Sequence, residues 1–160
     1  MTSRAGFTSP GGILYDGTNI WVTDRADGMS AGNLFKLDST GVIIQTAAVG
    51  TSPDYPCFDG TNIWVPNTFS DTVTVIRAST GTVLSTLTGN GLNGPTEAAF
   101  DGERVLVTNF AGNRVSLWKA SDLSPLGSVS TGSATGPGGV CSDGLNFWIT
   151  LATTGKLARF

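Results

Sequence analysis

Apolar residues along this chain of 160 residues fall in short runs rich in β-branched and aromatic side chains. In residues 53–87, the runs CF, IWV, TVTVI and TVLSTL are separated by DGTN, a short loop and ASTG. Runs of this length, bounded by Gly, Asp, Asn and Ser, are typical of antiparallel strands joined by tight turns. No stretch combines a sustained 3.6-residue period with capping signals, so we expect no α-helix. The pattern predicts an all-β protein.

The strand pattern is repeated four times in phase. Around four Asp-Gly pairs the sequence reads GGILYDGTNIWVT, YPCFDGTNIWVP, EAAFDGERVLVT and GVCSDGLNFWIT. The anchoring residues are Asp16, Asp59, Asp101 and Asp143, which are separated by 43, 42 and 42 positions. A four-stranded antiparallel unit that recurs every 40–45 residues or so is a β-propeller blade. We therefore expect a single β-propeller domain over residues 1–160, built from four blades of about 42 residues.

The repeats resemble those of a known group of propellers. Segments such as FDGTNIWVPN, DTVTVI and ASTGTV are similar to the repeats of bacterial YVTN-type and NHL-like propellers, including virginiamycin B lyase-like proteins. The resemblance covers essentially the whole chain and implies blade architecture, because the shared residues are those that build a blade. For the lyase-like proteins it also implies a catalytic histidine, and this sequence contains none. That departure argues against lyase activity of their type.

The last repeat lacks a fourth strand, and the chain has an extra segment before its first repeat. The fourth unit ends with GKLARF, residues 155–160, at the place of a third strand, and residues 1–8 stand where a fourth strand would stand. We therefore expect residues 1–8 to complete the last blade, as strands do when propellers close their ring. Three arrangements stay open: a homo-oligomer of two chains that exchange N-terminal strands to form an eight-bladed ring, a closed four-bladed monomer, and four blades of a longer chain.

Several repeated positions have a structural interpretation. The Gly of each Asp-Gly pair supplies the positive φ of a hairpin turn. Trp21, Trp64 and Trp148 share one position in the second strand, where we expect them to fill the space between blades. Cys57 and Cys141 lie two residues before their Asp on the innermost strand. Because blades two and four are not adjacent, we expect two buried free thiols and no disulfide.

The candidate functional residues are polar and lie at the ends of the first two strands of a blade. Asp24, Asn67 and Asn109 follow a second strand, and Asp54 and Glu97 lie before or within a first strand. In a propeller these places share one face around the central channel, so the side chains could contact a protein or glycan ligand, or hold Ca²⁺ through oxygen atoms. Asp and Asn at strand ends also form hydrogen bonds with nearby backbone groups. Both interpretations stay open.

Composition disfavours some classes of partner. A net charge of −3, with nine scattered Lys and Arg residues, leaves no basic stripe for nucleic acid. No apolar run approaches 18 residues, so we expect no membrane span, and the N-terminal residues lack the apolar core of a secretory signal. Charged residues make up 13% of the chain, and Thr, Ser, Asn and Gly dominate its polar surface. Such a composition is more common in extracellular or particle-associated proteins, although the compartment itself stays open.

The residue types also bear on catalysis. Without histidine the chain lacks the usual general base at neutral pH and the commonest transition-metal ligand. We therefore expect a non-enzymatic binding or scaffolding module without a cofactor, which recognises a protein, peptide or glycan or serves as an assembly component. The alternative is a calcium-dependent propeller enzyme that resembles sugar-lactone hydrolases or lyases. The loop RADGMSAGN, residues 25–33, is longer than its counterparts in blades two and three and is the expected local specialisation.

Overall fold

The computed structural model describes residues 3–160, and every helix or strand in that range is a β-strand, as predicted. The strands form four antiparallel sheets, three with four strands and the last with three. Blade one contains β1 (Pro10–Tyr15), β2 (Ile20–Asp24), β3 (Ala31–Leu37) and β4 (Ile43–Thr51). Blade two contains β5 (Cys57–Phe58), β6 (Asn62–Asn67), β7 (Thr72–Arg77) and β8 (Val83–Leu87). Blade three contains β9 (Pro95–Phe100), β10 (Arg104–Asn109), β11 (Arg114–Lys119) and β12 (Pro125–Ser130). Blade four contains β13 (Pro137–Ser142), β14 (Phe147–Leu151) and β15 (Lys156–Arg159).

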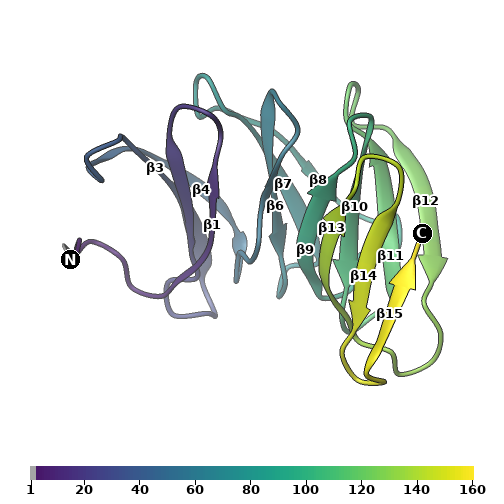
Figure 1. The fold of residues 1–160 in the computed structure, drawn as a ribbon. Helices are drawn as coiled ribbons and strands as arrows, with labels where there is room; N and C mark the ends of the chain where they lie inside the picture. Colours follow the sequence, from purple (N-terminus) through teal and green to yellow (C-terminus); the bar gives the residue numbers. More distant parts are fainter. Residues whose placement is uncertain (1–2) are drawn as a thin grey trace.

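The four blades follow one another in chain order, with blade one at one end of the molecule and blade four at the other (Figure 1). Apolar side chains at both ends of this series are exposed to solvent, including Ile13 at 69% and Leu157 at 63%. The single chain therefore forms an open arc of propeller blades. A closed four-bladed monomer, one of the three arrangements left open by the sequence, is not what the structure shows.

Each Asp-Gly turn is organised by its carboxylate. Oδ1 of Asp59 accepts the N–H groups of Thr61 and Asn62 at 2.8 and 2.6 Å, and Oδ2 accepts the indole N–H of Trp64 at 2.7 Å. The turns at Asp16 and Asp143 repeat this arrangement with their own tryptophans. The glycine that follows has a φ of +86° to +107° in the four blades, a conformation that only glycine adopts freely. The aspartate thus fixes both the turn and the orientation of the tryptophan ring.

Blade three varies this turn by a paired exchange. Leu106 replaces the tryptophan, and Arg104 stands where the other blades have Asn. The Arg104 Nε donates to Oδ2 of Asp101 at 2.8 Å, in the place of the indole N–H. The carboxylate therefore keeps a donor although the ring is gone.

Alternate residues of each strand lie on two faces of a blade. We call the face turned toward the next blade in the chain its forward face, and the opposite one its rear face. Trp21, on the forward face of blade one, is fully buried in a cluster with Ile63 of blade two. Trp64, on the forward face of blade two, is fully buried in a cluster with Val105 of blade three. These contacts confirm that the tryptophans of the first two blades fill the space between blades.

The last blade departs from this prediction. Trp148 is half-buried, and Cys141 is exposed. The prediction that Cys141 is buried is wrong for the single chain, because no further blade covers the forward face of blade four. Cys57, at the same position in blade two, is half-buried, and the loss of solvent around its thiol raises the pKa of Cys57 far above its usual value. Both cysteines are free thiols, as predicted.

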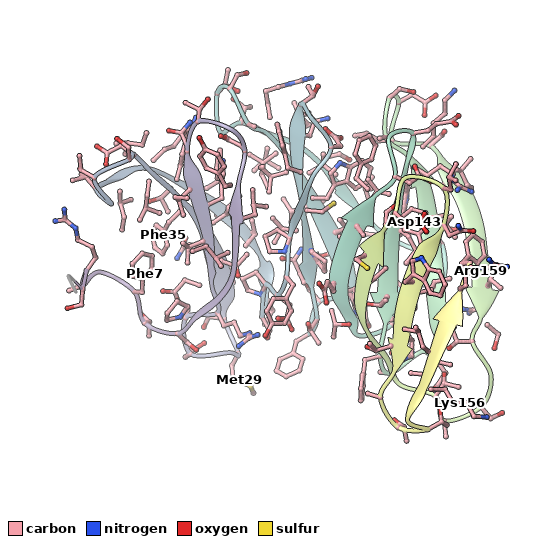
Figure 2. All side chains as sticks on the ribbon, viewed as in Figure 1. Phe7, Met29, Phe35, Asp143, Lys156 and Arg159 are labelled. Atoms are coloured by element: carbon pink, nitrogen blue, oxygen red, sulfur yellow. The ribbon has the colours of Figure 1, made fainter. Side chains whose placement is uncertain are left out.

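The described part of the N-terminal segment, residues 3–9, lies on the rear face of blade one. The rings of Phe7 and Phe35 meet edge to face with their centroids 5.4 Å apart. Figure 2 labels both side chains beside blade one. The guanidinium group of Arg4 donates to the carbonyl of Thr40. In the single chain the segment therefore packs on blade one, whereas its pairing with the last blade of a second chain stays a prediction. Of the expected strand over residues 1–8, residues 1 and 2 lie outside the described part.

Candidate functional site

Asp24 lies at the end of β2 and fastens the chain that enters blade one. Its side chain is 2% exposed and accepts the backbone N–H groups of Thr8, Ser9 and Ala26 at 2.6, 3.0 and 2.8 Å. Burial alone would raise the pKa of Asp24, but the three donors outweigh it and hold the pKa below its ordinary value. Both carboxylate oxygens are therefore used within the blade.

Asn67 and Asn109 hold the corresponding positions and are fully buried. The Asn109 side chain accepts the backbone N–H of Asn93 at 3.1 Å and donates to the hydroxyl of Ser116 at 2.9 Å. The Asn67 side chain donates to the hydroxyl of Thr74 at 2.9 Å, and its Oδ1 is buried without a donor among residues 3–160. With Asp24, these residues link strands inside their own blades. The structure places none of the three at an open surface.

Asp54 and Glu97 lie at the same end of the blades, near the innermost strands of blades two and three. Asp54 forms an ion pair with Arg25, with 2.6 Å between Nη2 and Oδ1. Burial raises the pKa of Glu97; the backbone N–H of Val140 opposes this rise, and the negative charge of Asp54 adds to it. The structure therefore brings Asp54 and Glu97 together with Arg25. The sequence located Arg25 only as the first residue of the long loop.

This charged group lacks the composition of a metal centre. A hard cation such as Ca²⁺ takes about six to eight oxygen ligands. Across residues 3–160, no group of three or more His, Cys, Asp or Glu side chains could hold a metal ion. Arg25 already occupies one oxygen of Asp54. Within the described residues, Asp54 and Glu97 are therefore two carboxylates beside one guanidinium group, and their contact with a ligand stays a prediction.

Large apolar side chains are exposed at the end of the blades that carries Asp54 and Glu97. Met29, Phe69 and Phe110 follow the second strands of blades one, two and three and are 81%, 66% and 46% exposed. Met29 marks this end at the lower edge of Figure 2. Tyr55, just before β5, is 49% exposed. It lies beside Glu97 in a parallel bridge, in which its backbone N–H donates to the carbonyl of Thr96 and its carbonyl accepts the N–H of Ala98. Aromatic side chains exposed in this way are enriched at protein interfaces and stack on sugars.

Two grooves lie at the opposite end of the blades, beside the Asp-Gly turns. One, of about 480 Å³, separates blades one and two and is lined by Asp16, Lys36 and Phe58 among others. The other, of about 350 Å³, separates blades two and three and is lined by Asp59 and Glu103 among others. The repeat pattern predicted the turns but not the grooves, because their width depends on how neighbouring blades splay apart.

Known proteins resemble this chain in their three-dimensional structure. No protein-family model matches the chain, and no curated protein matches it. Among solved structures, hydrazine synthase of Kuenenia stuttgartiensis superposes with a TM-score of 0.80 at 18% identity, over 100% of this chain and 48% of that one. The chain is a β-propeller. A catalytically inactive virginiamycin B lyase from Staphylococcus aureus with quinupristin gives 0.75 at 18% identity, over 99% and 54%. A putative 6-phosphogluconolactonase from Bacteroides uniformis gives 0.73 at 19% identity, over 99% and 55%.

These similarities establish the fold, and they show that the chain is about half as long as the matched propellers. At identities below 20%, the matches concern architecture alone. The chain spans about half the length of the propellers that it matches. Among the described residues, no helix is long and apolar enough to cross a membrane.

Proposed function

We propose that this chain is a non-catalytic propeller module that binds a protein, peptide or glycan through the loops after its second strands. The observation that carries the proposal is the row of exposed Met29, Phe69 and Phe110 on three successive blades. Loops on a rigid frame are the usual place of recognition residues, and large apolar side chains exposed together mark interaction surfaces. Arg25 and Glu97 supply polar groups at the same end of the blades.

The state of the polar residues supports binding over catalysis. Asp24, Asn67 and Asn109 use their side chains within the blades, so they are not available to a reacting molecule. The matched lyase structure is described as catalytically inactive in a variant that replaces a histidine by alanine, and this chain contains no histidine at all. The propeller frame is thus shared with enzymes, while a general base of that kind is missing.

The surface can be tested on arrays of oligosaccharides and of peptides. We expect the wild-type chain to bind members of one array, and the double variant Phe69→Ala, Phe110→Ala to bind them at least tenfold more weakly, because aromatic anchors dominate such contacts. Leu145→Ala is a matched control, since Leu145 is 83% exposed at the Asp-Gly turn of blade four. Silence on both arrays would contradict the proposal, as would equal loss of binding in the control.

A further inference from the structure

The forward face of blade four is not covered by another blade in the single chain. In blades one to three the corresponding positions are covered by the rear face of the next blade. In blade four Thr150 and Cys141 are exposed, and Leu157 is 63% exposed. We call this surface the open face; its residues are Cys141, Trp148, Thr150, Leu157 and Arg159.

A repeated threonine shows what the open face lacks. The hydroxyl of Thr23 donates to the carbonyl of Asp54 in the next blade at 3.1 Å, and the hydroxyl of Thr108 donates to the carbonyl of Gly138 at 2.7 Å. Thr150 holds the same register in blade four and makes the same bond to its own first strand as Thr23 does. Its bond to a following blade has no acceptor within residues 3–160. The Thr150 hydroxyl therefore stands in the position from which Thr23 and Thr108 bond the next blade.

Two further positions of blade four match blade one, although not blades two and three. At Gly12 a Cβ atom would come within 2.5–2.9 Å of atoms of blade two, so the close approach of that blade requires glycine. Gly139 holds this register in blade four. Lys36 lies opposite the tryptophan of its blade and donates to the carbonyl of Ala78 in the next blade at 2.8 Å. Arg159 lies opposite the tryptophan of blade four, so the open face also carries a cation at this register.

We propose that the open face binds the rear face of blade one of a second copy of this chain, so that two copies close one ring head to tail. Rear faces pack on forward faces at every interface that the structure shows, and the rear face of blade one is the remaining one. Its Ile13 is 69% exposed, whereas Val140, at the same register in blade four, is 8% exposed against blade three. In the proposed contact Ile13 would therefore be buried against blade four of the other copy, as Val140 is buried against blade three.

The size of the arc favours a second copy as the partner. The chain superposes along 99–100% of its length on 48–55% of three larger propellers, with TM-scores of 0.73–0.80. Its four blades therefore have the curvature of about half of such a propeller, and a second arc would supply the other half. A head-to-tail contact of this kind forms a closed particle when its rotation completes a ring, here after two copies.

The N-terminal segment would supply the missing fourth strand of blade four in this ring. Residues 8–10 and 51–53 both read TSP, and residues 51–53 leave the fourth strand of blade one. In the ring, residues 3–7 leave Phe35 and pair with the free edge of β15 in the other copy. Thr8 and Ser9 stay bound to Asp24, just as Asn93, between β8 of blade two and β9 of blade three, donates its N–H to Asn109.

Light scattering of the purified chain across a concentration series tests the proposal. We expect a mass twice the 16.5 kDa of one chain. Leu157→Asp places a charge in the open face and is expected to give the single-chain mass with an unchanged far-ultraviolet circular dichroism spectrum. Leu145, an even more exposed leucine of the same blade, lies outside the open face, so Leu145→Asp is expected to keep the doubled mass. Thr150→Arg serves as a second variant if Leu157→Asp does not fold.

Thiol labelling gives a second readout. In the ring Cys141 is covered as Cys57 is in blade two, so we expect its labelling rate to fall at least tenfold between dilute and concentrated wild-type protein. In Leu157→Asp the rate is expected to stay high at all concentrations. Three results would overturn the proposal. They are a single-chain mass with rapid labelling of Cys141, a dimer that persists in both Leu157→Asp and Thr150→Arg, and assemblies that grow beyond two chains. None of these outcomes depends on the loop surface, whose binding is tested separately on the arrays.

Discussion

Thr108 offers a direct test of how neighbouring blades are held together. It is fully buried, and its hydroxyl donates to the Gly138 carbonyl across the boundary between blades three and four at 2.7 Å. The same hydroxyl accepts the backbone N–H of Glu97 at 3.2 Å. Thr108→Val keeps the shape of the side chain, but it leaves the N–H of Glu97 without an acceptor and the carbonyl of Gly138 without a donor. A buried group left in that state costs about 1–3 kcal/mol.

We therefore expect Thr108→Val to lower the free energy of unfolding by about 2–4 kcal/mol, with the gain from the added methyl group offsetting part of the two penalties. Urea denaturation followed by tryptophan fluorescence would show this as a fall of about 1–2 M in the midpoint. Thr86→Val is the control, because Thr86 is exposed on β8, and a change within about 0.5 kcal/mol is expected there. A loss in Thr108→Val no larger than in the control would refute the inference that the hydroxyl holds the two blades together.

Three further predictions concern the candidate site. Asp24→Ala removes the acceptor of the Thr8 and Ser9 amides, so hydrogen exchange at these amides should accelerate; unchanged exchange would show that the carboxylate does not fasten the segment. Because the folded-state pKa of Glu97 is raised above 4.5, the native state binds this proton more tightly, and wild-type stability should fall as pH rises above that value. Glu97→Gln should lack this fall, and parallel pH profiles would contradict the assignment. Millimolar Ca²⁺ should leave Tm unchanged, since residues 3–160 contain no group of three or more carboxylates that could hold it; a rise of several degrees would contradict this.

Much of the fold could be predicted from the sequence because its determinants are local. The Asp-Gly pairs specify turns, and the alternation around Trp21 and Trp64 specifies strands with two faces. Since these signals recur at a fixed spacing, four blades can be predicted from the amino-acid sequence alone. The repeat also located the inter-blade position of the tryptophans, because a residue that is large in most copies of a repeat fills a space common to those copies.

The candidate site was harder to predict because its geometry depends on contacts between blades. Asp24, Asn67 and Asn109 share a position, but the sequence does not tell which backbone donors reach their oxygens. The ion pair of Arg25 with Asp54 joins residues of two blades and depends on how these blades pack. Exposure of Cys141 was missed for a related reason, since the repeat equates it with Cys57 while only Cys57 has a following blade.

Negative-stain electron microscopy of the concentrated wild-type chain would show whether the open face of blade four is occupied. We expect closed rings, each formed by two arcs of four blades. Isolated four-bladed arcs under the same conditions would contradict it.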